Sequence, residues 1–150
     1  MELLDIIKED TVFLGLEAAN REECVAAMLA GMEKAGLVKD AAAYLNALNE
    51  REAKGTTAIG FGVAIPHGKS DGMAAPGLAF AQLKTSIDWN SLDGSPVQLV
   101  FMIGVPMEAA GDEHIKILIA LSRKLIHADF REKLLAVQSK QELFQVLQGI

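Results

Sequence analysis

Val97-Gln98-Leu99-Val100-Phe101-Met102-Ile103 is a nearly continuous apolar stretch in which Gln98 is the one polar residue. Such a run is typical of a strand at the centre of a sheet, because both of its faces must be covered. Leu78–Leu83 has a similar composition. We therefore expect these two segments to form the middle of the sheet and to decide the fold.

Helices are expected on either side of these strands along the chain. Several residues that cap helix N-termini precede apolar positions at helical spacing. The expected caps are Asn20, Asp40, Asp112, Asp129 and Ser139. Glu23 and Glu142 stand where a capping box would place them. Gly36 is expected to end the first helix, and the third is expected to end at about His127.

Two shorter strands are expected at Thr11–Leu16 and Val63–Ile65, and Asp93-Gly94 is expected to form a turn. Because helices both precede and follow the strands, we predict the α/β class. The expected architecture is a three-layer domain with a mixed β-sheet of about five strands and helices on both faces. Residues 1–150 are expected to form a single domain.

Composition narrows the function. The chain has 14 Lys and Arg against 20 Asp and Glu, a net charge of −6, which argues against nucleic acid as the main partner. No apolar stretch approaches the roughly 20 residues of a membrane span, and no secretory signal is visible, so we expect a cytoplasmic protein. Cys24, the single cysteine, is expected to be a small buried side chain.

Gly60-Phe61-Gly62-Val63-Ala64-Ile65-Pro66-His67-Gly68 is the stretch most indicative of chemistry. Pro66 restricts the backbone before His67, and Gly68 leaves room after it for a bulky anion. We expect His67 to emerge at the end of a strand with its imidazole presented to solvent. Because neutral imidazole is a good nucleophile, His67 is the first candidate for a catalytic residue. The glycines do not match a dinucleotide-binding fingerprint.

Two further residues are candidates for the same site. His114 follows the expected cap Asp112 in the first turn of a helix, where anions are favoured and where a histidine can donate to a phosphoryl oxygen. Arg51 lies near the end of the second expected helix, and its guanidinium suits bidentate bonds to phosphate. Each has a simpler interpretation as a solvated surface residue. Thr56 and Thr57 are expected to be turn and strand residues.

On these residues the sequence resembles the enzyme IIA domain of the fructose and mannitol branch of the bacterial sugar phosphotransferase system. The matching residues are Arg51-Glu52, Gly60-x-Gly62-Val63-Ala64-Ile65-Pro66-His67-Gly68, Glu113-His114-Ile115 and Leu121-Ser122. The resemblance spans essentially the whole chain. Phe61 departs from it, since relatives often have a polar residue there, and is expected to alter partner contacts rather than chemistry.

The resemblance implies a phosphotransferase that works without a cofactor or metal. His67 would accept a phosphoryl group on Nε2 from phospho-HPr and pass it to a cysteine of a cognate enzyme IIB, and Arg51 and His114 would stabilise that group. The membrane would be reached only through the transporter partner. Cys24 does not lie where an enzyme IIB acceptor would. The sequence does not reveal which sugar is served or the oligomeric state.

Two alternatives stay open. Nitrogen-regulatory IIA proteins resemble this chain and are phosphorylated at an equivalent histidine, but they act by binding regulatory targets. A metal-dependent hydrolase would use His67 and His114 as ligands, yet a zinc site usually adds a third ligand and the sequence has no His-Glu-x-x-His or paired-cysteine pattern.

Overall fold

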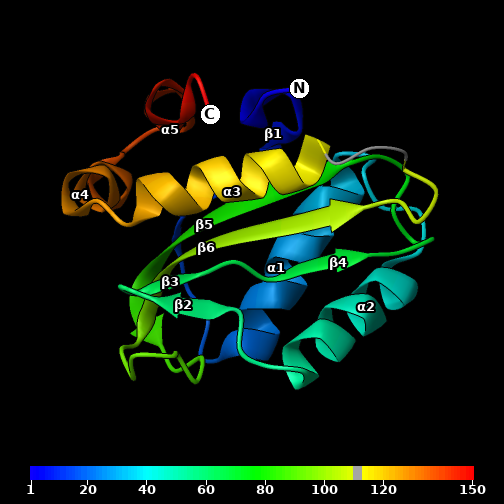
Figure 1. Cartoon of the computed structure of the whole chain (residues 1–150), viewed down its shortest axis with the longest axis horizontal. Coiled ribbons are helices and arrows are strands. Elements are labelled where there is room, and N and C mark those ends of the chain that lie inside the picture. Colours follow the sequence, from blue (N-terminus) through cyan, green and yellow to red (C-terminus); the bar gives the residue numbers. More distant parts are fainter. Residues whose placement is uncertain (110–112) are drawn as a thin grey trace.

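A mixed sheet of six strands lies between two layers of helices in the computed structural model, which describes residues 1–109 and 113–150 (Figure 1). The strands are β1 (Ile7–Leu16), β2 (Ala58–Gly60), β3 (Val63–Ala64), β4 (His67–Lys69), β5 (Gly77–Ile87) and β6 (Val97–Val105). The helices are the 3-10 turn η1 (Leu3–Asp5), α1 (Arg21–Lys34), α2 (Ala41–Ala53), α3 (Glu113–Leu125), α4 (Ala128–Ala136) and α5 (Lys140–Leu147). The predicted three-layer α/β class is confirmed.

The two apolar segments form the centre of the sheet, as expected. The strand order is β1-β5-β6-β3-β2, and β5 and β6 pair antiparallel through Phe80 and Phe101. On one side β1 pairs parallel with β5, and on the other β3 pairs parallel with β6. Because β5 and β6 have neighbours on both edges, their backbone groups are satisfied within the sheet.

A single track along β6 holds both β3 and β4. Val63 and Ala64 pair with Leu99 and Val100, and His67 pairs with Ile103 in the same register. The interruption falls at Ile65-Pro66, although the Pro66 carbonyl still accepts from the Ile103 amide at 3.0 Å. The expectation that the strand ends before His67 is therefore wrong. The strand resumes at His67, because proline removes only a donor and fixes a φ that extended backbone tolerates.

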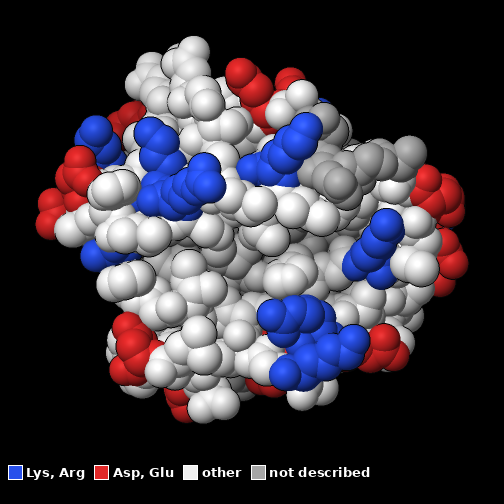
Figure 2. Space-filling model, in the orientation of Figure 1, with Lys and Arg blue, Asp and Glu red and all other residues white. Residues whose placement is uncertain are grey.

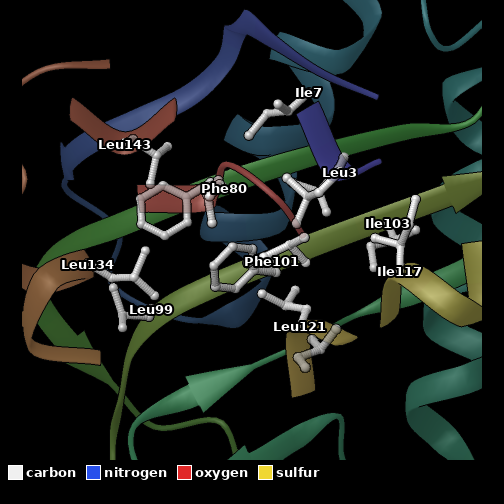
Figure 3. Packing of buried hydrophobic residues seen from close by; sticks show 14 of the residues in the cluster. Leu3, Ile7, Phe80, Leu99, Phe101, Ile103, Ile117, Leu121, Leu134 and Leu143 are labelled. Atoms are coloured by element: carbon white, nitrogen blue, oxygen red, sulfur yellow. The ribbon is translucent and has the colours of Figure 1, made fainter. Parts of the chain in front are cut away.

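The sheet buries both of its faces in hydrophobic clusters. Along β6, Phe101 and Ile103 point toward α3, α4 and α5, whereas Val100 and Met102 point toward α1 and α2. Figure 3 shows Phe80 and Phe101 side by side in the first cluster, with ring centroids 5.0 Å apart. The alternation explains why β6 must be apolar at nearly every position.

Three of the predicted helix caps are confirmed. The Asn20 side chain accepts from the Glu23 amide at 2.9 Å, and Asp40 accepts from the Ala43 amide at 3.2 Å. Ser139 accepts from the amide of the residue that was expected to complete its capping box, at 3.1 Å. These caps fix the first turns of α1, α2 and α5.

The prediction that Asp129 caps a helix is wrong, and the expected cap Asp112 lies outside the described residues. Asp129 lies in the first turn of α4, which begins after His127. Arg131 donates to the carbonyls of Leu125 and Ile126 at 2.7 and 2.9 Å. Because this guanidinium satisfies the last carbonyls of α3, the next helix can start almost at once. None of the helices in the described ranges is long and apolar enough to cross a membrane.

Replacing Phe101 by alanine tests the importance of the central pair. Phe101 is fully buried, so Phe101→Ala should lower the free energy of unfolding by about 3–5 kcal/mol through lost burial and a residual cavity. Chemical denaturation measures this change. The control Ile126→Ala, at a side chain 62% exposed, should change it by less than about 0.5 kcal/mol. Equal effects of the two substitutions would contradict the assignment of the core.

Candidate active site

Two histidines from distant parts of the sequence line one small cavity. His67 reaches it from the first residue of β4, and His114 from the first turn of α3. The cavity has a volume of about 80 Å³, and Ile103, Val105 and Leu118 supply apolar walls. Both imidazoles are half-buried. An apolar surround strengthens any hydrogen bond that forms inside it, so the cavity suits a small charged group held by few donors.

A hydrogen bond to the backbone fixes the His67 ring. Its Nδ1 lies 2.9 Å from the carbonyl oxygen of Ile65. A carbonyl oxygen can only accept, so Nδ1 carries the proton in this contact. In the neutral ring Nε2 then keeps its lone pair. The arrangement prepares one particular nitrogen as a nucleophile.

The backbone around His67 is held from both sides. The Ile65 amide donates to the carbonyl of Thr57 at 2.9 Å, and β4 pairs with β6. Gly68 borders the cavity, but a side chain there would point toward α2, where a Cβ would lie 3.2 Å from that of Ala47. The absent side chain of Gly68 therefore lets α2 pack closely. Room for an anion lies on the other face of the strand.

Arg51 is not among the residues that line the cavity. It lies one helical turn beyond Ala47, on the face of α2 that packs against β4, and α2 covers the side of the sheet opposite to the two histidines. Its Nη1 donates to the Gly55 carbonyl at 2.8 Å and closes the end of the helix. A guanidinium has five N–H donors, so this bond leaves others for a ligand that approaches the open edge of β4.

Sequence reasoning missed Lys69 and Leu118, which also border the cavity. Lys69 is exposed and lies two residues after His67 in β4. The period of two in a strand puts both side chains on one face, and that signal could have identified the lysine. Leu118 lies four residues after His114, and the helical period carries the same information.

His127 and Cys24 take no part in this site. His127 occupies the N-cap position of α4 and does not line the cavity. Cys24 is fully buried beneath the sheet, and burial raises the pKa of its thiol to about 12. Such a thiol stays protonated and unreactive, as expected of a packing residue. Within the described residues, no group of three or more His, Cys, Asp and Glu side chains could hold a metal ion.

Phe61 forms the tip of a turn beside the other end of β3. Its φ is +59°, between Gly60 at +108° and Gly62 at +77°, a conformation that side chains other than glycine rarely adopt. The Asp93 carboxylate holds the turn by accepting from the Phe61 amide at 3.0 Å. The exposed ring lies 4.5 Å from the guanidinium carbon of Arg131. This position fits the expected role in partner contacts, away from the histidines.

The titration of Asp93 tests how this turn is held. Hydrogen bonds from the Ser95 hydroxyl, the Phe61 amide and the Ser95 amide lower its pKa from 3.8 to about 2. A lowered pKa in the folded state means that the bonds stabilise the turn above pH 3.8 and are lost as the pH falls through about 2. An NMR titration should give a midpoint of about 2, followed also by the Phe61 amide signal.

Ser95→Ala removes the strongest of these bonds and should raise the midpoint toward the ordinary value. A wild-type midpoint at 3.8, or no change in Ser95→Ala, would contradict the described geometry.

The match to a known family agrees with these features. Residues 5–149 match the family model described as "Phosphoenolpyruvate-dependent sugar phosphotransferase system, EIIA 2". The fructose-specific EIIA component of Haloferax volcanii is 46% identical over 129 residues, which cover 86% of this chain and 83% of that protein. A nitrogen regulatory protein of Bradyrhizobium diazoefficiens is 35% identical over 148 residues, covering 98% of this chain and 95% of that one.

The fold is also shared with a solved complex. In the complex of enzyme IIAMTL and phosphorylated enzyme IIBMTL from Escherichia coli, the matching chain is 25% identical with a TM-score of 0.80, and the alignment covers 97% of this chain and 100% of that one. Because the family model covers nearly the whole sequence, the chain belongs to the EIIA type 2 family of phosphotransferase components of the phosphoenolpyruvate-dependent sugar phosphotransferase system.

Proposed function

We propose that this chain is a sugar-transport phosphocarrier that accepts a phosphoryl group from phospho-HPr on Nε2 of His67. It would pass the group to a cysteine of an enzyme IIB from a fructose- or mannitol-type transporter. The observation that carries the proposal is the His67 ring, whose Nδ1 is bound to the Ile65 carbonyl while the ring lines a cavity shared with His114. Acceptance requires a positioned nitrogen lone pair, and this geometry supplies one.

Each transfer is a displacement at phosphorus. The Nε2 lone pair forms the new bond to phosphorus while the bond to the donor breaks, and its electron pair returns to the donor. In the second step the thiolate of enzyme IIB attacks phosphorus, and the pair of the breaking P–N bond returns to Nε2. The ring ends as it began, so the carrier is regenerated without a cofactor. Phosphoryl transfer depends mainly on positioning and charge stabilisation.

His114 and Arg51 are the residues proposed to stabilise the transferred group. His114 shares the cavity with His67, so an N–H of its imidazole can reach a phosphoryl oxygen there. Arg51 is proposed to act from the edge of β4, with the donors that its bond to Gly55 leaves available. Lys69, which also borders the cavity, adds a further positive charge near the same oxygens.

The face around the cavity suits protein partners that carry acidic groups. Figure 2 shows basic side chains over the end of α2, beside β4 and along α3, while acidic ones gather toward the margins of this view. The basic residues of these elements include Arg51, Lys54, Lys69, Lys116 and Arg123. Ile115 and Ile119 of α3 are 43% and 47% exposed and give the same face an apolar part. Complementary charge of this kind speeds encounter with a partner.

The compartment and the extent of the unit follow from the same proposal. The carrier would work in the cytoplasm as a single domain of residues 1–150, and it would meet the membrane only through its transporter. Which sugar is transported would depend on the partner components rather than on this chain.

The second candidate is a regulator that uses the same phosphorylated histidine. A nitrogen regulatory protein matches 98% of this chain at 35% identity, which supports this alternative. The two functions share His67 and differ in what the phosphorylated chain binds. The higher identity to a fructose-specific component, 46%, favours transport.

Substitution of each histidine tests the assignment of roles. His67→Ala should abolish labelling by phospho-HPr, because the acceptor nitrogen is removed. His114→Ala should still become labelled but should pass the group to enzyme IIB about 100-fold more slowly, since a donor to the phosphoryl oxygens is lost. The third histidine provides the control, and His127→Ala should behave as wild type. Undiminished labelling of His67→Ala would overturn the proposal.

A partner assay separates transport from regulation. The phosphorylated chain is mixed with enzyme IIB proteins of the fructose and mannitol types, and loss of label from His67 is followed over time. Transfer within seconds to one of them supports the carrier. Failure with all of them, together with phosphorylation-dependent binding to a kinase or channel, would establish the regulator instead.

A further inference from the structure

We propose that Glu52 and Thr57 are positioning residues that set the tautomer and orientation of His67 through the backbone of Ile65. Neither side chain lines the cavity, so neither touches a phosphoryl group directly. They act on the ring through consecutive hydrogen bonds. The inference rests on the proposed function only for its kinetic consequence, because the tautomer exists before any phosphoryl group arrives.

The first link is a two-point contact between Glu52 and Thr57. The carboxylate accepts from the Thr57 amide and from the Thr57 hydroxyl, both at 2.7 Å. Thr57 is 3% exposed, and the Glu52 side chain is 15% exposed. Charged acceptors form the stronger hydrogen bonds, and two of them fix both the position and the rotation of the threonine.

The carboxylate is itself held from the other side. Arg21 places its Nε 3.6 Å from the Glu52 oxygen, and the Trp89 indole donates to the same oxygen at 3.4 Å. Thr56 adds a bond from its hydroxyl to the carbonyl of Trp89 at 3.0 Å. Glu52 therefore joins α1, the end of α2 and the loop after β5, and it gives the segment before β2 a rigid anchor.

The next links run from Thr57 to the ring. The Thr57 carbonyl accepts from the Ile65 amide at 2.9 Å, and the Ile65 carbonyl faces Nδ1 of His67 at 2.9 Å. Pro66 separates Ile65 from His67 and limits how the intervening peptide can rotate. A fixed Ile65 peptide therefore means a fixed acceptor for the ring.

Polarisation along the chain of bonds acts in the same direction. The negative carboxylate at one end aligns the dipoles of the Thr57 and Ile65 peptides, and successive hydrogen bonds strengthen one another. The Ile65 carbonyl becomes a better acceptor for the Nδ1 proton, which favours the tautomer with a free Nε2. A residue in the interior thus acts on the reactive nitrogen without contact.

Glu52→Gln and Thr57→Val are the informative substitutions. Glutamine keeps the size of Glu52 but replaces one acceptor oxygen by a donor, and valine keeps the shape of Thr57 but removes its hydroxyl. The first measurement is the ratio of His67 tautomers in the unphosphorylated protein, obtained from ring ¹⁵N shifts in NMR spectra. Each substitution should lower the ratio of the Nδ1–H form to the Nε2–H form by about tenfold.

The second measurement is the rate of labelling by phospho-HPr. Maximal rates should fall by about tenfold, while the donor concentration at half-maximal rate stays within about twofold, because the partner surface is unchanged. Thr57→Ser retains the hydroxyl and should restore both readouts. Glu50→Gln removes the same charge from an exposed position on the same helix and should leave both as in wild type.

The outcomes separate the two proposals. An unchanged tautomer ratio in folded Glu52→Gln and Thr57→Val overturns the positioning role, even where labelling of the wild type succeeds. Wild-type protein that is never labelled overturns the carrier function, whereas the tautomer ratio still decides the positioning role. If Thr57→Val does not fold, Glu52→Gln decides alone. An equal shift in Glu50→Gln would attribute the effect to net charge and would also overturn the positioning role.

Discussion

The hydrogen bond between Nδ1 of His67 and the carbonyl of Ile65 is the contact on which the proposed chemistry depends. It decides which nitrogen keeps its lone pair, and it exists because the strand along β6 is interrupted at one place and then resumes in register. Pro66 produces that interruption without ending the strand. The central sheet thus holds the ring as firmly as it holds its own backbone, and α3 brings a second imidazole to the same cavity.

The distribution of charge gives the site its direction. The chain carries a net charge of −6, yet basic side chains surround the face where the histidines meet (Figure 2). A carrier must meet two partners in succession on one open face, and a small cavity with apolar walls lets a phosphoryl group be held by few donors. A deep pocket would enclose the group and hinder its transfer, whereas this arrangement favours passage from one protein to another.

Local patterns predicted much of the fold and of the site. Apolar runs identified the central strands, and side-chain caps such as Asn20 identified helix starts, because both signals act over a few residues. The resumption of the strand at His67 could not be predicted, since it depends on pairing with β6, more than 30 residues away in the chain. The anchoring of Thr57 by Glu52 was also missed, because it becomes visible only when α1, α2 and the loop after β5 are brought together. Arg51 shows the opposite case, since a residue selected for its chemistry lies outside the cavity and contacts Gly55.

The position of phosphorus on the ring tests the central claim most directly. A uniformly ¹⁵N-labelled chain is phosphorylated by phospho-HPr, and the coupling between ³¹P and the ring nitrogens is measured by NMR. The account predicts a single phosphohistidine at His67 with phosphorus on Nε2 and the proton retained on Nδ1. Phosphorus on Nδ1 of His67, or on any other residue of the chain, would contradict it.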